Sequence, residues 1–244
     1  MEWIDEGIIV SSRHHGESSS VICLFTKEHG RHAGLVRGAR NKNNSGIYQL
    51  GNGVTARWRA RLTEHLGIFN CEMTDARAAR LIEDNLRLEG LLSICSLIEI
   101  ALPERHPYPE LYSRTISFLD DFEDSASWIQ NLIMWELKLL ADLGFGLDLS
   151  VCALTGEKEN LAYVSPRTGR AVTFAAGEPY REKLLSLPKF TIDQSSEGKI
   201  STKGDISAGL KLTEWFISRH LLSARKTKMP AARNRLAKRW ENKI

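Results

Sequence analysis

Residues 21–42 read Val-Ile-Cys-Leu-Phe-Thr-Lys-Glu-His-Gly-Arg-His-Ala-Gly-Leu-Val-Arg-Gly-Ala-Arg-Asn-Lys. The apolar run at 21–25 has the length and composition of a buried strand, and Gly30 ends the turn that follows it. A second strand, at 31–36, leads into a basic loop that continues through the turn-forming residues Asn-Asn-Ser-Gly at 43–46. This order predicts a β-scaffold that presents a positively charged loop.

Further strands are expected on both sides of this stretch. A short strand at 7–10 precedes it, the apolar run extends to 18–26, and two more strands are expected at 54–62 and 66–71. Five short strands punctuated by glycines suit a small closed barrel of the OB type. We therefore expect an α+β protein whose N-terminal domain, residues 1–72, is an OB-fold β-barrel.

The strand expected at 54–62 alternates in character, with Trp58 on one face and arginines on the other. A basic strand face beside a basic loop is typical of a surface that binds a phosphate backbone. The candidate DNA-binding residues are Arg31, Arg37, Arg40, Lys42, Arg57, Arg59 and Arg61. The alternative is that these side chains form a charged, solvated surface without a ligand.

Beyond residue 72 the apolar spacing changes to that of helices. Residues 73–148 are expected to form a helical bundle, with helices at 77–88, 91–102, 110–122 and 128–143. Residues 149–244 are expected to form a small C-terminal element that contains a hairpin at 163–174, an amphipathic helix at 206–222 and a short basic helix that begins at Pro230.

Charge is segregated along the chain, although the formal net charge is only +3. Residues 7–71 carry nine Lys and Arg against three Glu, whereas residues 72–150 carry six basic against fifteen acidic side chains. Residues 151–244 carry eighteen basic against nine acidic side chains. Two basic ends around an acidic middle predict modules with different partners.

The sequence argues against several classes of protein. No apolar run approaches the roughly 20 residues of a membrane helix, and the acidic N-terminus lacks the features of a signal peptide, so a cytoplasmic protein without membrane contact is expected. No nucleotide-binding, hydrolase or metalloprotease motif is present, so we expect no enzyme activity. The seven histidines lack ligand spacing and are interpreted as surface or turn residues.

The four cysteines are far apart and include no C-x-x-C pair, which argues against a zinc ribbon and against a disulfide framework. We expect buried free thiols and neither a metal nor another cofactor. The cysteines are Cys23, Cys71, Cys95 and Cys152.

Short motifs also follow one another in a characteristic order. They are Gly-Ile-Ile-Val at 7–10, Gly-Glu-Ser-Ser at 16–19, Leu-Phe-Thr-Lys-Glu-His-Gly at 24–30, Val-Arg-Gly-Ala-Arg at 36–40, Trp-Glu-Leu-Lys-Leu-Leu-Ala-Asp-Leu-Gly-Phe-Gly at 135–146, Ser-Pro-Arg-Thr-Gly at 165–169 and Met-Pro-Ala-Ala-Arg at 229–233. In this order they resemble the RecO family of bacterial recombination and repair proteins.

The resemblance implies an N-terminal OB-fold, a central helical bundle and a C-terminal element. It also implies binding to single- and double-stranded DNA, annealing of complementary strands, and help in loading recombinase onto strands covered by single-strand-binding protein. The implied protein partners are RecR and the acidic C-terminal tail of single-strand-binding protein. Arg114, Lys138 and Arg233 are the candidate partner-binding residues.

Two segments depart from the family pattern. Many members carry a four-cysteine zinc motif after the central helix, but here only Cys152 remains, with Thr155 at the second position and Thr173 and Ala176 near the other pair. Residues 149–244 are therefore expected to hold a degenerate zinc-motif-like hairpin without zinc, followed by basic helices. Residues 132–134, Leu-Ile-Met, replace basic residues at which tail docking is proposed in some members.

Two other functions are compatible with the same features. The chain could be an adaptor that binds acidic proteins through its helical bundle and basic tail, with the OB domain as a scaffold. It could also be an RNA-binding OB protein. Binding to DNA and RNA over a salt series separates these hypotheses, because phosphate-driven binding weakens steeply as salt rises.

Overall fold

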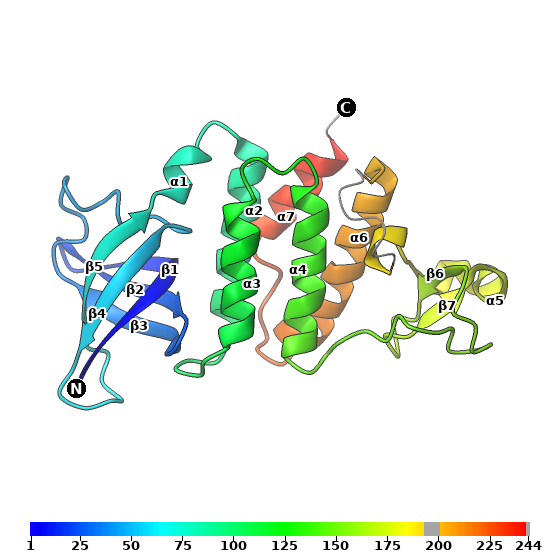
Figure 1. Cartoon of the computed structure of the whole chain (residues 1–244), viewed down its shortest axis with the longest axis horizontal. Coiled ribbons are helices and arrows are strands. Elements are labelled where there is room, and N and C mark those ends of the chain that lie inside the picture. Colours follow the sequence, from blue (N-terminus) through cyan, green and yellow to red (C-terminus); the bar gives the residue numbers. More distant parts are fainter. Residues whose placement is uncertain (193–200, 243–244) are drawn as a thin grey trace. The chain divides into compact units, whose positions relative to one another are not determined.

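A computed structural model describes residues 1–192 and 201–242 (Figure 1). The chain divides into two compact units, which are residues 1–116 with 230–236 and residues 117–229 with 237–244. The three-domain division at residues 72 and 148 stays a prediction. Within the described ranges, no helix combines the length and the apolar character needed to cross a membrane.

The first unit contains the β-barrel. Its strands are β1 Glu2–His15, β2 Ser19–Thr26, β3 Gly30–Val36, β4 Gly53–Arg59 and β5 Ile68–Asp75, in the spatial order β1-β2-β3-β5-β4. Strand β1 pairs with both β2 and β4, and a single parallel pair, Leu35 with Ile68, joins β3 to β5 and closes the barrel. This topology confirms the predicted OB-fold, and the helices that follow confirm the α+β class.

Three strands differ from the expectation, and one of them, β5, runs over Ile68–Asp75 rather than over 66–71. Strand β1 is much longer than residues 7–10, because residues 2–8 pair with β4 and residues 7–15 pair with β2. Strand β4 ends at Arg59, three residues earlier than predicted. The chain leaves the sheet at Ala60, whose N–H donates to the carbonyl oxygen of Met1 at 3.0 Å.

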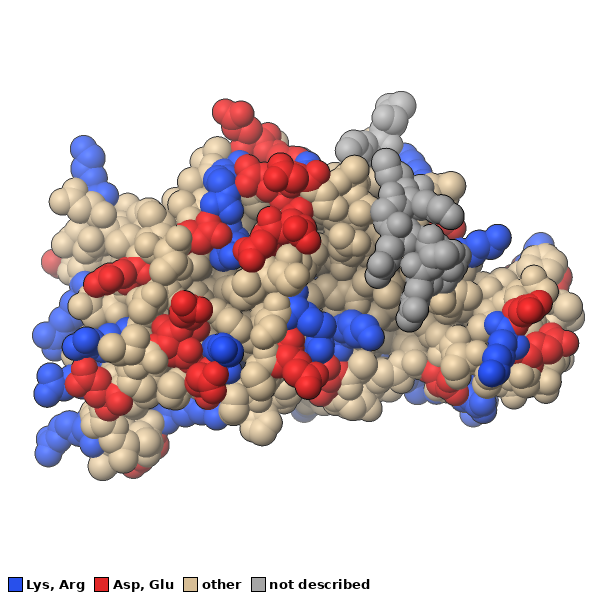
Figure 2. All heavy atoms as spheres, in the orientation of Figure 1, with Lys and Arg blue, Asp and Glu red and all other residues tan. Residues whose placement is uncertain are grey.

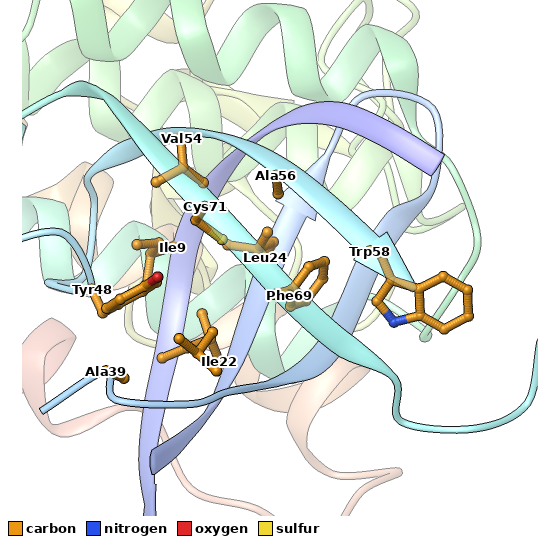
Figure 3. Packing of buried hydrophobic residues seen from close by; sticks show 11 residues of the cluster. Ile9, Ile22, Leu24, Ala39, Tyr48, Val54, Ala56, Trp58, Phe69 and Cys71 are labelled. Atoms are coloured by element: carbon orange, nitrogen blue, oxygen red, sulfur yellow. The ribbon is translucent and has the colours of Figure 1, made fainter. Parts of the chain in front are cut away.

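The barrel is filled by a cluster of buried apolar side chains from all five strands and from the loop between β3 and β4 (Figure 3). Trp58 lies at one end of this cluster, and Ala39 and Tyr48 lie at the other (Figure 3). Gly34 is required by the packing, since a Cβ at this position would lie 2.4 Å from the ring of Phe69. The inward positions of the strands are therefore fixed by close packing.

Helices complete the first unit. Helix α1, Arg77–Arg80, is separate from α2, Asn85–Ala101, whereas the sequence predicted one helix at 77–88. The break arises because Asp84 is the N-cap of α2, where its carboxylate accepts hydrogen bonds from the backbone N–H groups of Leu86 and Arg87 at 3.0 Å. Helix α3, Pro109–Asp120, follows.

The second unit combines helices with a small sheet. Its described elements are α4 Trp128–Asp142, β6 Leu161–Val164, β7 Ala171–Thr173, α5 Phe174–Gly177, η1 Glu178–Lys183, β8 Leu185–Ser186, η2 Lys189–Thr191, α6 Lys203–Phe216 and η4 Ile217–Leu222. Helix α7, Ala231–Glu241, is the last described element, and its residues up to Leu236 belong to the first unit. Helix α6 packs on α4, and the hydroxyl of Thr213 donates to the buried carboxylate of Glu136. The helix expected at 206–222 changes to a π-helical turn at Ile217.

Candidate nucleic-acid interface

The basic loop between β3 and β4 is tied to the barrel rather than free. Ala39 and Tyr48 are buried in the barrel core, so the loop is anchored at two points along its length. Gly38 has a positive φ of 67°, and its carbonyl oxygen accepts from the N–H of Asn41 at 3.1 Å and from the Asn44 amide at 3.2 Å. Glycine permits this turn without strain, and the turn fixes the direction of the neighbouring side chains.

Arg40 connects the loop to the turn between β1 and β2. Its N–H donates to the carbonyl oxygen of Ser18 at 3.1 Å, and its guanidinium donates to that of Glu17 at 2.9 Å. A carbonyl oxygen carries no net charge, so these bonds hold the arginine in place while its positive charge remains available.

Three cations of this loop face solvent without a compensating acid. Arg37, Arg40 and Lys42 are exposed, and among the described residues no carboxylate lies within ion-pair distance of any of them. Lys and Arg side chains project along the left edge of the view, over the barrel (Figure 2). Uncompensated charge of this kind attracts a polyanion over several ångströms.

Strand β4 shows the alternation that the sequence predicts. Arg57 and Arg59 are exposed, whereas Ala56 and Trp58 are buried. The Arg57 guanidinium lies 3.3 Å from the Glu2 carboxylate, and an exposed pair of this kind contributes at most about 1 kcal/mol. A phosphate can therefore replace Glu2 at little cost.

Arg61 differs from its predicted position. Because β4 ends at Arg59, Arg61 lies in the loop after the strand and does not share the strand face with Arg57 and Arg59. It is exposed, and neither Arg59 nor Arg61 has a carboxylate within ion-pair distance in the described ranges. Its role as a DNA contact stays a prediction.

The barrel brings the loop and the end of β4 towards each other. Ile68 of β5 pairs with Leu35 of β3 on one side and with Arg59 of β4 on the other. Because neighbouring strands are about 4.8 Å apart, Arg59 lies roughly two strand spacings from the end of β3, where Arg37 follows. We call the five uncompensated cations the basic surface: Arg37, Arg40, Lys42, Arg59 and Arg61.

Arg31 is bonded within the first unit, and its role as a DNA contact stays a prediction. Its Nε donates to the carbonyl oxygen of Leu102 at 2.9 Å, and its Nη1 lies 3.2 Å from the carboxylate of Glu104. Only 14% of its side chain is exposed. The guanidinium therefore fastens β3 to the segment after α2, and its charge is already balanced.

The predicted partner-binding residues are divided between the two units. Arg233 is 1% exposed, and a partner-binding role for this residue stays a prediction. Arg114 lies on α3 in the first unit, with its Nη1 3.5 Å from the Glu110 carboxylate, whereas Lys138 is exposed on α4 in the second unit. A docking role for Arg114 and Lys138 stays a prediction.

One histidine contradicts the interpretation that the histidines are surface or turn residues. His32 points into the barrel and is 4% exposed, beside Trp3 and Trp58. A cavity of about 610 Å³ opens at this point. The sequence held a signal for the burial of His32, because in a strand at 31–36 this residue shares its face with Gly34 and Val36.

The degenerate zinc motif does not fit a zinc ion. Tetrahedral structural zinc needs four thiolate or imidazole ligands, and here Cys152 stands alone beside Thr155 and Thr173. No group of three or more His, Cys, Asp or Glu in the described part of the chain is arranged to hold a metal. The Cys152 sulfur instead accepts from the Thr173 N–H at 3.3 Å.

Hydrogen bonds perturb the Cys152 thiol. Burial works against its ionisation, but the Thr155 hydroxyl and the backbone N–H groups of Thr173 and Leu154 outweigh that effect and lower the pKa of Cys152 to about 6. The turn around Cys152 therefore stabilises a thiolate through hydrogen bonds, although the other metal ligands are missing.

Two family models match the chain, "Recombination protein O N terminal" at residues 1–77 and "Recombination protein O C terminal" at residues 82–229. The chain belongs to the RecO family. Among its relatives, the DNA repair protein RecO of Rhodospirillum centenum (strain ATCC 51521 / SW) is 46% identical over 242 residues, which cover 98% of this chain and 95% of that protein.

Two further relatives of the RecO family agree. The DNA repair protein RecO of Rhodopseudomonas palustris (strain TIE-1) is 47% identical and covers 92% of this chain and 90% of its own length. That of Jannaschia sp. (strain CCS1) is 42% identical, with 100% of this chain and 98% of the relative covered. Family membership places the chain among DNA repair proteins, and the barrel corresponds to the N-terminal family model.

Proposed function

We propose that this chain binds single- and double-stranded DNA through the basic surface and acts in the cytoplasm as a non-enzymatic mediator of recombinational repair. The observation that carries the proposal is a set of five exposed cations on the tethered loop and at the end of β4, none of which has an acidic partner among the residues that the structure describes. Each cation that neutralises a phosphate releases condensed counterions, which favours binding whatever the base sequence.

The proposal includes annealing of complementary strands and help in loading recombinase onto strands covered by single-strand-binding protein. Its support is the resemblance to the RecO family, together with a charge argument. Two DNA strands repel each other, and a cationic surface that neutralises phosphates reduces that repulsion and raises their local concentration. RecR and the acidic tail of single-strand-binding protein are the proposed protein partners.

A non-enzymatic role is supported by the sequence, which holds no motif for nucleotide hydrolysis, nucleophilic catalysis or metal-assisted chemistry. Binding and bringing strands together require charge and shape but no reacting group. Direct tests are therefore binding and annealing assays rather than turnover assays.

The basic surface can be tested with a labelled single-stranded oligonucleotide over a salt series. If about four of its cations contact phosphates, log K falls with log salt at a slope of about −2.8, and raising salt from roughly 50 to 200 mM weakens binding about 50-fold. Changing Arg37 and Arg40 together to Ala removes about two contacts and flattens the slope by about 1.4. Arg167→Ala is the matched control, because Arg167 is an exposed loop arginine of the second unit.

A slope near zero for the wild-type protein, or an unchanged slope in the double variant, would reject the basic surface as the DNA site. Equal binding to RNA would favour the RNA-binding alternative. Annealing of two complementary strands, measured with and without single-strand-binding protein, tests the mediator role. Full annealing activity in the double variant would remove the basic surface from that role.

A further inference from the structure

The barrel contains an open cavity of about 610 Å³ that is distinct from the exposed cations of the basic surface. Its volume lies within the usual range for small-ligand sites, roughly 300–1,000 Å³. Buried Trp58 and His32 form its floor, half-buried Trp3 and His29 form its wall, and exposed residues such as Arg105 form its rim. All of these residues belong to the first unit.

The floor and wall are aromatic and fixed in position. The rings of Trp3 and Trp58 are nearly parallel, with centroids 5.6 Å apart, and His32 lies edge-on to both at 5.1 and 4.9 Å. The Trp58 indole N–H donates to the carbonyl oxygen of Leu66 at 3.0 Å, which locks its ring. Rigid aromatic surfaces bind flat ligands with little loss of conformational entropy.

His32 gives this cavity an unused hydrogen-bonding group. Its ring is 4% exposed, and neither Nδ1 nor Nε2 has a hydrogen-bond partner among the residues that the structure describes. Burying a polar group without a partner costs free energy, so such a group indicates a missing partner. Burial, with the charges of Arg105 and His29, lowers the pKa of His32 to about 4, so the neutral ring offers one donor and one acceptor.

The rim is close to neutral. Two cationic groups, the N-terminal ammonium of Met1 and the Arg105 guanidinium, line the cavity together with two acidic residues, Glu2 and Glu28. Both cations are also bound to backbone, since Met1 donates to the carbonyl oxygen of Ala60 at 2.7 Å and Arg105 donates to that of His65 at 2.8 Å. The site therefore suits an uncharged ring rather than a phosphate or a carboxylate.

We propose that this cavity binds a single unstacked nucleobase. A base is flat and uncharged, and its edge carries the donors and acceptors that His32 lacks. A phenyl or alkyl side chain of a peptide would fill the same volume but leave both ring nitrogens of His32 unsatisfied. The base's own strand would pass near β4, which places Trp58 in the floor and the exposed Arg59 on its other face.

This inference rests on the proposed function in one respect, which is that DNA supplies the base. The basic surface would hold the backbone without regard to the bases, and the cavity would hold one base out of the stack. A base held in the cavity cannot pair with a complementary strand or stack on the bases next to it in its own strand. The cavity would therefore fix the position of the strand while the neighbouring bases stay accessible.

The test compares three 12-nucleotide strands of equal phosphate count: oligo-dT, a fully abasic strand, and an abasic strand with one central thymidine. Stacking one base on an aromatic ring strengthens binding about 5- to 150-fold. We expect oligo-dT to bind more tightly than the abasic strand by a factor in this range, and the single thymidine to restore most of the gain. The gain should have the same size at each salt concentration, because the phosphate count is constant.

Two variants assign the gain to the cavity. His32→Leu removes two buried nitrogens without partners, so it keeps the fold, and it should reduce the difference between oligo-dT and abasic DNA to less than twofold. Trp3→Ala should do the same, with a thermal melt to check its folding. The double variant with Arg37 and Arg40 changed to Ala is the matched control, because it should weaken binding to all three strands by the same factor.

A direct probe separates the cavity from the basic surface. Deoxyadenosine, which has no phosphate, should shift the indole N–H resonance of Trp3 in the wild-type protein and leave it unmoved in His32→Leu. Equal binding of oligo-dT and abasic DNA overturns the inference even where the salt slope supports DNA binding. If deoxyadenosine shifts the resonance but DNA affinity does not change with salt, the cavity is supported as a base site and the basic surface is rejected as the DNA site. If only an aromatic peptide shifts the resonance, the nucleobase assignment is overturned.

Discussion

The imidazole of His29 lies flat on the indole of Trp3, with ring centroids 4.0 Å apart and an interplanar angle of 9°. The buried carboxylate of Asp5 holds the histidine in place, with its Oδ2 2.9 Å from His29 Nδ1. The same carboxylate accepts from the N–H groups of Glu6 at 2.8 Å and of Glu28 at 2.9 Å. Asp5 thus fastens the turn between β2 and β3 to β1 and orients the wall of the cavity.

Asp5→Ala should therefore destabilise the barrel end. The change leaves three donors without their acceptor in a partly buried place, which should lower the free energy of unfolding by about 2–4 kcal/mol. Denaturant unfolding measures this value. Glu28→Ala is the control: the exposed Glu28 carboxylate lies 3.9 Å from the Lys27 ammonium, and the change keeps the backbone N–H that Asp5 accepts from, so the variant should stay within about 0.5 kcal/mol of wild type. A loss below 0.5 kcal/mol in Asp5→Ala would contradict the role of this carboxylate.

Arg31 and Arg37 should separate stability from DNA binding. Arg31→Ala removes the bonds to Leu102 and Glu104 and should lower the free energy of unfolding by about 1–3 kcal/mol, with an unchanged salt slope. Arg37→Ala should do the reverse, with unchanged stability and a slope about 0.7 flatter. Denaturant unfolding and the salt series, run on both variants, check the contrast. The opposite pattern would identify Arg31 as a DNA contact.

The buried His32 predicts a loss of stability in acid. Burial, with Arg105 and His29, lowers its pKa from 6.5 to about 4, so between these values the unfolded chain binds a proton that the folded chain does not. The free energy of unfolding should therefore fall as pH drops below about 6.5, by roughly 2.5 kcal/mol at about pH 4.5.

His32→Leu isolates this effect from the titration of other groups. The difference in unfolding free energy between variant and wild type should change by roughly 2.5 kcal/mol in favour of the variant between neutral pH and about pH 4.5. Denaturant unfolding at several pH values gives this difference. If this difference does not depend on pH, folding does not lower the pKa of His32.

The Cys152 turn predicts the metal content. Purified protein should contain well under one zinc per chain, and a chelator should leave its melting temperature unchanged. Substituting Thr155, Thr173 and Ala176 together with Cys should restore a four-thiolate set and bind one zinc per chain, because the Cys152 sulfur already lies 3.7 Å from Thr173 Oγ1. Stoichiometric zinc in the wild-type protein would refute this account.

Much of the fold follows from local pattern. The alternation around Trp58 correctly predicted which face of β4 is exposed, and the apolar stripe at 128–143 correctly predicted α4. Both depend on short-range periodicity, which a single sequence displays. Asp84 also carried a usable signal, because an aspartate followed by an apolar helix is a common N-cap, and the prediction of one helix at 77–88 overlooked it.

Local pattern could not show which basic side chains face solvent and which are bonded inside the protein. Arg31 and Arg37 both lie next to a glycine in a basic stretch, yet one is bonded to the segment after α2 and the other faces solvent. That difference depends on Leu102 and Glu104, about seventy residues later in the chain. Arg233 is similar, since a basic, mostly polar helix gave no indication that this arginine is buried. Tertiary contacts of this range are invisible to periodicity.

The first compact unit consists of two pieces, residues 1–116 and 230–236. Within it, Arg235 Nε lies 2.6 Å from the Glu89 carboxylate, and Leu236 is fully buried. During translation, the second piece leaves the ribosome roughly 6–24 s after the first, at ordinary rates of synthesis. The first unit therefore stays incomplete until the chain is almost finished, and a nascent chain that stalls before residue 230 lacks the arginine that pairs with Glu89.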